Sequence, residues 1–166
     1  MHKHLFSDLP DDPRAAAVTL ARRGFSVFPC NPANKAPLTP NGFHDASSDV
    51  SDVARMFNKA GSGVMIGFPT GLVNGVIALD VETIEGHDAD GESDLAALSA
   101  EGFHVTDSVC QVRTRSGGRH IYFRCPPGGR SGFKFKRNGI EVRGDGNYTI
   151  APPSVYFTGQ FWEVIQ

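Results

Sequence analysis

The hydrophobic and polar positions of the chain predict helices mainly in its first two thirds. The segment that begins at Pro13 is rich in alanine and leucine and stops at Gly24. A proline in the first turn and a glycine just beyond the last turn are typical of helix ends. Two later segments also suit helices, and the second of them follows an acidic stretch that favours a helix N-terminus. The pattern therefore predicts helices over residues 13–23, 51–60 and 93–101.

Short runs of β-branched and aromatic residues predict strands, and clusters of glycine, proline and asparagine separate them. Helices come early and most strands late, so we predict an α+β fold with antiparallel strands towards the C-terminus. The predicted strands are FSVFP (25–29), VMIGF (64–68), VIALDVE (76–82), VCQVRT (109–114), HIYFRC (120–125), GIEVRG (139–144), NYTIAPPS (147–154) and FWEVI (161–165).

The length of 166 residues suits one domain. No apolar run approaches the roughly 20 residues that span a bilayer, so we expect a cytoplasmic protein without a membrane partner. The start, MHKHLFSDLPDD, lacks the features of a secretory signal, and we expect a flexible arm over residues 1–12. Cys30, Cys110 and Cys125 lack the spacing of a zinc site, so we expect buried free thiols and no zinc.

The net charge of −2 conceals two regions of opposite sign. From Asp80 to Asp107 every Asp, Glu, Lys or Arg position is acidic, whereas from Arg113 to Arg143 basic residues far outnumber acidic ones. Carboxylates beside a basic region suit divalent metal ions and a phosphate-rich partner. A solvated charged surface would give the same composition, so the choice depends on specific motifs.

Asp80 and Glu82 end the apolar strand VIALDVE. Residues two apart on a strand point to the same face, about 6.6 Å apart along the chain, so both carboxylates could bind one metal centre. Like charges held together without a cation are unfavourable, which favours a metal. The alternative is that the strand simply emerges into solvent at this point.

The segment RTRSGGRHIYF predicts a tight turn between two strands. Its N–H groups and the side chains around it offer hydrogen-bond donors to phosphate oxygens, and glycine lets a ligand approach the backbone closely. An ordinary hairpin turn requires the glycines, but it does not require so many basic residues close together. Here they are Arg113, Arg115, Arg119 and His120. We therefore expect Ser116, Gly117, Gly118, Arg119 and His120 to bind nucleotide.

The segment GIEVRGDGNYTIAPPS adds a third carboxylate, Glu141, with Arg143 on the same face of the predicted strand. Arg143 could balance Glu141 or contact a nucleotide phosphate, and an exposed salt bridge of little energetic value is the alternative. Three carboxylates near a donor-rich turn suit phosphoryl transfer by two divalent ions, which prefer oxygen ligands. Zinc would instead call for cysteine and histidine ligands.

In this order, the segments resemble the N-terminal domain of bifunctional DNA primase/polymerases, a family of plasmid, phage and prophage replication proteins. The resemblance runs from about Ala15 to Trp162 and includes RRGFSVFPCNPANKAPLTPNGFHDASSD, GVIALDVE, TRSGGRHIYFR and GIEVRGDGNYTIAPPS. It implies one catalytic domain over residues 13–166. In it, an RRM-like mixed or antiparallel sheet (about 76–166) lies beside a smaller N-terminal αβ unit (about 13–75), with the active site in the cleft between them.

The resemblance also implies residue roles. Asp80, Glu82 and Glu141 would hold two Mg²⁺ or Mn²⁺ ions, although the family more often has Asp at the position of Glu141. His120 and Ser116 would contact the phosphates of the incoming nucleoside triphosphate. Lys35 lies in the family's Lys-x-Pro loop, where we expect a nucleotide or template contact.

The expected activity is the joining of nucleoside triphosphates to a primer or initiating nucleotide on single-stranded or primed DNA. In this family a helical bundle and often a helicase follow the domain. A metal-dependent nuclease would use the same three acids. A non-catalytic RRM-like module could instead stack bases on exposed aromatic rings. Its candidate rings are Tyr122, Phe123, Phe133, Phe135 and Tyr148.

Overall fold

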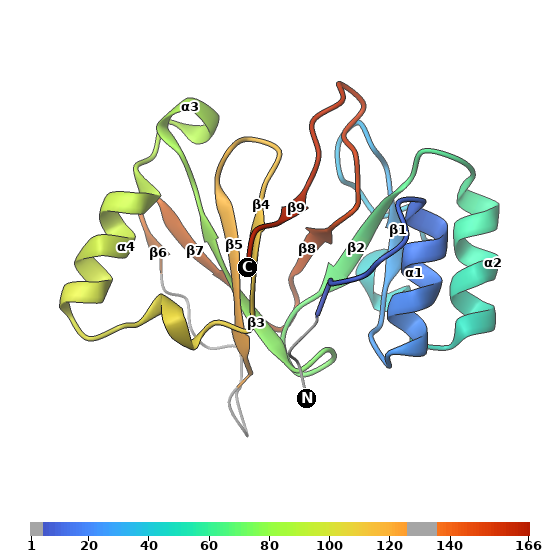
Figure 1. The fold of residues 1–166 in the computed structure, drawn as a ribbon. Coiled ribbons are helices and arrows are strands. Elements are labelled where there is room, and N and C mark those ends of the chain that lie inside the picture. The colour runs from blue at the N-terminus through green and yellow to red at the C-terminus, as the bar shows by residue number, and fades with distance from the viewer. Residues whose placement is uncertain (1–4, 126–135) are drawn as a thin grey trace.

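The chain folds as a mixed α+β protein, which confirms the predicted fold class (Figure 1). The computed structural model describes residues 5–125 and 136–166. All strand pairs within these residues are antiparallel, so the prediction of an antiparallel sheet is confirmed over a mixed one. The likeness of the larger sheet to an RRM stays a prediction.

The three longer helices each begin at an aspartate whose side chain accepts a hydrogen bond from a backbone N–H of the first turn. Asp12, Asp49 and Asp90 are these N-cap residues, and their charge suits the positive end of the helix dipole. The helices match the three predicted ones within two residues at each end, and no described helix is long and apolar enough to cross a bilayer. The helices are α1 (Pro13–Arg22), α2 (Val50–Ala60), α3 (Ile84–His87) and α4 (Gly91–Ala100), with 3-10 turns at Gly42–Asp45 and Val105–Asp107.

The described strands form a three-stranded sheet in the order β1-β2-β8 and a six-stranded sheet in the order β6-β7-β3-β5-β4-β9. The chain therefore returns to the first sheet with β8 after building most of the second. The strands are β1 (Phe28–Cys30), β2 (Met65–Pro69), β3 (Val76–Val81), β4 (Cys110–Arg113), β5 (Arg119–Arg124), β6 (Lys136–Arg137), β7 (Ile140–Arg143), β8 (Tyr148–Ala151) and β9 (Glu163–Val164).

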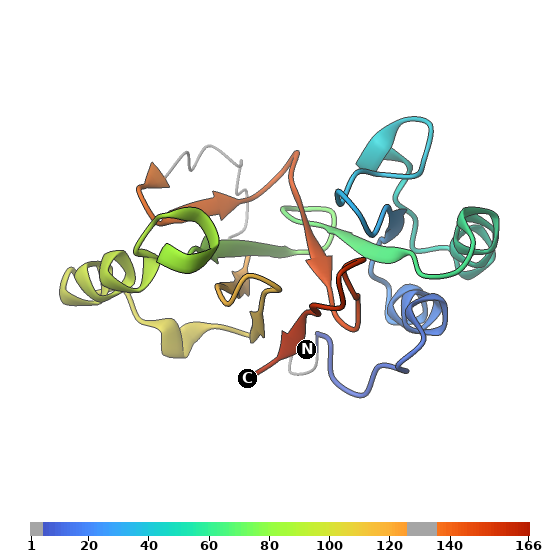
Figure 2. The ribbon, with the colours of Figure 1, turned by 90° about the horizontal axis from the view of Figure 1, so that it is seen from above.

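Both sheets lie between the helices, with α1 and α2 on one side of the molecule and α4 on the other (Figures 1 and 2). The larger hydrophobic core contains residues of both sheets, among them Phe68 of β2 and Tyr122 of β5. The Tyr122 hydroxyl donates a hydrogen bond to Oγ1 of Thr149 on β8 (2.9 Å). A second, smaller core under α4 includes Leu79 and Leu95. The larger core therefore packs the six-stranded sheet against the three-stranded sheet, on the face away from α4.

Two residues of the predicted N-terminal arm are part of the fold. Leu5 and Phe6 are only 1% and 3% exposed, and the Phe6 ring packs edge to face against Phe68 and Tyr122. The prediction of a flexible arm over residues 1–12 is therefore wrong for this part. The physical reason is that burying two large apolar side chains stabilises the arm's contact with the core.

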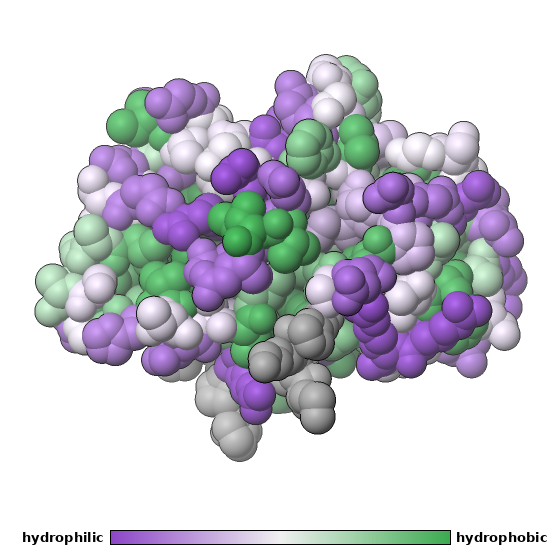
Figure 3. Space-filling view, viewed as in Figure 1, coloured by the Kyte–Doolittle hydropathy of each residue, from purple (hydrophilic) through white to green (hydrophobic). Residues whose placement is uncertain are grey.

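β9 forms one edge of the six-stranded sheet, and β6 forms the other. Figure 3 shows hydrophobic residues gathered over β9, where Val164 and Ile165 are 36% and 39% exposed. β9 has only two residues. So short an edge strand offers few unpaired backbone groups to another chain.

The free thiols differ in burial, which gives a first prediction. Cys30 and Cys110 are buried, and burial raises the pKa of each thiol to about 12. Because the thiolate is the reactive form, these two cysteines should resist a thiol reagent at pH 8 in the folded protein. Cys125 is partly exposed, so the prediction of buried thiols is wrong for this residue. We expect one cysteine to react quickly under native conditions and three after unfolding, and peptide mapping should identify the fast one as Cys125. Rapid native labelling of Cys30 would contradict the packing.

Candidate active site

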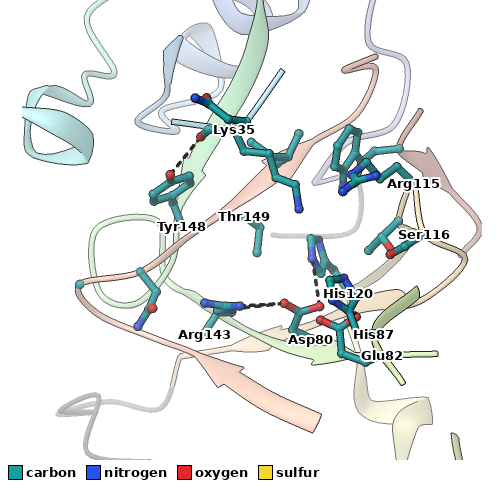
Figure 4. Close-up of a pocket in the computed structure, with 16 residues that line it drawn as sticks. Lys35, Asp80, Glu82, His87, Arg115, Ser116, His120, Arg143, Tyr148 and Thr149 are labelled. Atoms are coloured by element: carbon teal, nitrogen blue, oxygen red, sulfur yellow. Dashed lines mark hydrogen bonds and ion pairs between the residues drawn. The ribbon is translucent and has the colours of Figure 1, made fainter. Parts of the chain in front are cut away.

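A cavity of about 340 Å³ is lined by residues of both sheets. Figure 4 shows that its side chains converge from several separate segments. The six-stranded sheet supplies the acidic side, and the turn between β4 and β5 supplies hydroxyl and cationic groups. The loop between β1 and α2 and strand β8 complete the walls. The lining includes Asn34, Lys35, Asp80, Glu82, His87, Thr114, Arg115, Ser116, His120, Arg143, Tyr148, Thr149 and Trp162.

Asp80 is fixed by two basic side chains. On β3 it lies opposite His120 of β5 and opposite Glu141 of β7, so the three share one face of the sheet. Nε2 of His120 is 3.4 Å from Oδ1 of Asp80, and Nη2 of Arg143 is 3.1 Å from Oδ2. Burial raises the pKa of Asp80, but the hydrogen bond and charge of His120 and the charge of Arg143 outweigh it and lower the pKa to about 2. Asp80 is therefore an ionised and oriented carboxylate at neutral pH.

Glu82 lines the same cavity, as the strand alternation predicts. Burial and the negative charge of Asp80 raise the pKa of Glu82, against the opposing charges of His87, His120 and Lys35. Nε2 of His87, on α3, lies 3.4 Å from Oε2 of Glu82. Sequence reasoning missed His87. The sequence feature that could have indicated this contact is Thr83, the N-cap residue of α3. Its hydroxyl accepts a hydrogen bond from the N–H of Gly86, and the short helix that follows brings His87 back towards Glu82.

Glu141 lies next to the cavity but is not among its lining residues. Its side chain is 47% exposed, and its Oε2 is 3.0 Å from the same Arg143 nitrogen that contacts Asp80. Over residues 5–125 and 136–166, no three His, Cys, Asp or Glu side chains come together as a metal-binding group. Asp80 and Glu141 are neighbours that Arg143 bridges, whereas the three predicted acids do not form one cluster in the described part of the chain.

The turn between β4 and β5, which contains Ser116, Gly117 and Gly118, packs against the end of β3. Gly117 has φ +86°, a conformation that favours glycine, and its N–H donates to the carbonyl of Thr114 (3.0 Å). At Gly118 an added Cβ would lie 2.3 Å from the Val81 carbonyl oxygen. The Thr83 hydroxyl donates to the Ser116 carbonyl (3.0 Å). This close packing sets Ser116 and His120 on the cavity beside the two acids.

Lys35 enters from the opposite side, on a tight loop. Its backbone has φ +64°, its N–H donates to the Asn31 carbonyl (2.8 Å), and its carbonyl accepts from the Tyr148 hydroxyl (3.0 Å). Nζ lies 6.0 Å from the centre of the Trp162 ring. Burial and then the charge of Arg115 lower the pKa of Lys35, while Asp80 and Glu82 raise it. These backbone hydrogen bonds hold the loop of Lys35 beside the cavity despite the unfavourable backbone conformation.

Arg119 does not reach the cavity, contrary to the prediction that it binds nucleotide. It pairs with Glu92 of α4 (2.7 Å) and donates to Gln111 (2.8 Å). Neighbouring residues on a strand point to opposite faces, so Arg119 and His120 cannot both face the cavity.

The aromatic rings proposed for base stacking give little support to a binding module. Tyr122 is fully buried, and Phe123 packs against the smaller core. Phe133 and Phe135 lie outside the described residues. Tyr148 does line the cavity, but its hydroxyl is engaged with the loop of Lys35.

The acidic side of the cavity fits a divalent cation in its chemistry. Asp80 on β3 and Glu82 just after it provide hard oxygen donors, and burial together with the negative charge of Asp80 raises the pKa of Glu82. A cation bound between them would relieve the repulsion between the two carboxylates. Glu141 could join the same site if Arg143 released it, since that arginine contacts both Glu141 and Asp80.

A protein-family match covers most of the chain. The family described as bifunctional DNA primase/polymerase, N-terminal, matches residues 17–166, which include every residue of the cavity described above. No curated protein matches the chain. A match over most of the chain establishes the family, and we conclude that this chain belongs to the bifunctional DNA primase/polymerase N-terminal family.

Proposed function

We propose that the chain is a template-dependent nucleotidyltransferase that joins nucleoside triphosphates to a primer or to an initiating nucleotide on DNA. The family match supports primase or polymerase activity in general. The observation that carries the specific proposal is the two-sided cavity. Asp80 and Glu82 lie on one side with His120 and Ser116 beside them, and Lys35 faces them from the opposite side. Such an arrangement suits a ligand that brings both divalent cations and phosphates.

The proposed roles follow from the contacts. Asp80 and Glu82 would hold Mg²⁺ or Mn²⁺, in a two-ion site to which Glu141 contributes. When bound, these ions neutralise phosphate charge and favour ionisation of the attacking hydroxyl. Arg143 orients Asp80 through Oδ2 and balances Glu141. His120, Ser116, Gly117 and Gly118 would bind the triphosphate, with Lys35 adding a charge from across the cavity.

The natural context belongs to the same proposal. We propose that the chain acts in the replication of a plasmid, phage or other mobile element. Single-stranded or primed DNA would be the template, and a helical bundle or helicase would be its partner in a longer protein.

Primer extension tests the function directly. A 5′-labelled primer on a longer template should lengthen by added nucleotides when Mg²⁺ or Mn²⁺ is supplied with dNTPs or NTPs. The single-stranded template without a primer should yield new labelled products from labelled nucleotides if the chain also starts synthesis. Shortened primers in the absence of triphosphates would identify a nuclease instead. DNA binding without any extension would identify a non-catalytic module.

The substitution His120→Ala should raise KM for the nucleotide about tenfold and lower kcat, because a phosphate donor and a partner of Asp80 are lost together. The affinity for template DNA should change little, since that depends on the wider basic surface. His120→Gln keeps a hydrogen-bond donor and should lose less than His120→Ala. Steady-state kinetics and DNA titration on each variant separate these effects. An unchanged KM with weaker Mn²⁺ binding would show that His120 serves only the metal site.

A further inference from the structure

Three arginines surround the glycine turn, and the structure gives them different surroundings. Arg113 pairs with Glu163 (3.5 Å), and its side chain is 57% exposed. Arg119 pairs with Glu92 on the other face of the sheet. Arg115 lines the cavity and has no acidic partner among the described residues. The turn therefore presents one uncompensated guanidinium to the cavity.

The guanidinium of Arg115 is held by stacking. Its central carbon lies 4.0 Å from the centre of the Tyr156 ring, a distance typical of a cation–π contact. Nε of Arg115 is buried and finds no hydrogen-bond partner in the described part of the chain. A buried donor without a partner is costly, so this nitrogen favours a ligand that supplies an acceptor.

Lys35 gives the same cavity a second positive charge without an ion-pair partner among the described residues. The charge of Arg115 lowers the pKa of Lys35, second only to burial, so the two cations repel each other. An anion between them would convert this repulsion into attraction on both sides.

Tyr156 connects the two cations structurally. Besides stacking on Arg115, its hydroxyl donates to the Ala33 carbonyl (2.5 Å), two residues before Lys35 in the chain. The N–H of Phe157 donates to the Pro32 carbonyl (3.1 Å). One short C-terminal segment therefore holds both the guanidinium and the loop that carries the ammonium group.

We propose that Arg115 and Lys35 form a cationic clamp for the triphosphate of the incoming nucleotide, and that Tyr156 is the residue that positions Arg115. This proposal rests on the proposed function and adds Arg115 and Tyr156 to its nucleotide-binding residues. A triphosphate carries several negative charges and needs more than one cation, whereas each phosphodiester of a DNA strand carries one. The clamp also shares its cavity with Asp80, Glu82, Ser116 and His120, where the phosphates and their metal ions would lie.

Binding of inorganic tripolyphosphate, measured by calorimetry with Mg²⁺ present, tests the clamp independently of catalysis. Arg115→Gln should weaken binding about tenfold or more, since a charge-assisted hydrogen bond is lost. Arg115→Lys should lose less, because it keeps the charge but not the planar group. Arg113→Gln is the matched control: Arg113 ends β4 two residues before Arg115, and the variant should bind as the unaltered chain does. Single-stranded DNA titrated without tripolyphosphate should bind all of these variants alike.

Two substitutions at Tyr156 separate positioning from general stability. Tyr156→Phe keeps the ring and should bind tripolyphosphate within about threefold of the unaltered chain, whereas Tyr156→Leu should lose about as much as Arg115→Gln. The double variant Arg115→Gln/Tyr156→Leu should lose little more than either alone, because both changes remove one interaction. Tripolyphosphate binding that is equal in Arg115→Gln and Arg113→Gln would overturn the clamp. Weaker DNA binding with unchanged tripolyphosphate binding would assign Arg115 to the nucleic-acid strand instead. Failure of primer extension alone would contradict the proposed function and leave these binding results standing.

Discussion

Asp80→Asn should reduce nucleotide incorporation by about a hundredfold to a thousandfold while the fold is retained. Asparagine keeps the shape of the side chain but removes the negative charge that a divalent cation would need. It also leaves His120 and Arg143 facing a neutral group. Because Arg143 is partly exposed and keeps Glu141 as a partner, the loss in stability should be small. Primer extension under single-turnover conditions measures the effect on chemistry.

Glu92→Gln provides the matched control for that substitution. It neutralises a carboxylate on the opposite face of the same sheet, where Glu92 pairs with Arg119. Extension by Glu92→Gln should match that of the unaltered chain. Near-normal extension by Asp80→Asn would contradict the role of Asp80 as a metal ligand.

Gly118→Ala should lower the free energy of unfolding by about 3 kcal/mol, the cost of forcing extra volume into tight packing. The new Cβ would lie 2.3 Å from the Val81 carbonyl oxygen, and that atom belongs to the backbone of β3 and cannot rotate away. The strand beside Asp80 must shift to accommodate it. In a domain of this size the melting temperature should fall by about 6 to 12 °C. Chemical denaturation followed by circular dichroism measures the loss.

Gly117→Ala tests whether space or backbone conformation decides the outcome. Gly117 has nothing within 4 Å of an added Cβ, but its φ of +86° disfavours other residues. The expected cost is about 1 to 2 kcal/mol, less than for Gly118→Ala. An equal or larger loss at Gly117 would show that the contact with Val81 relaxes easily.

Much of the site follows from strand alternation, because a period of two decides which side chains share a face. That rule predicts that Asp80 and Glu82 face one cavity and that Arg143 lies beside Glu141, and the structure agrees on both. The same rule excludes Arg119 from the face of His120, a conclusion that the density of basic residues in the motif obscured.

Other features depend on contacts between distant segments, which no local pattern reports. His87 is a local exception: it reaches Glu82 through a helix of four residues, too short for a recognisable period, and only the capping residue Thr83 indicates that helix. The stacking of Arg115 on Tyr156 joins residues 41 positions apart. Burial of Leu5 and Phe6 depends on an apolar surface formed by β2 and β5, so the polar residues around them in the sequence gave no sign of it.

The hydrogen bond between Tyr122 and Thr149 limits how the two sheets can move relative to each other. It crosses from one sheet to the other beneath the cavity wall, inside a core that both sheets share. A hinge motion that opened the sheets would break this bond and expose the rings of Phe68 and Tyr122 to water, each an expensive change. The width between the sheets is therefore set during folding. The Ser116 turn and the Lys35 loop are also tied to the two sheets, so the cavity is largely preformed for its ligand.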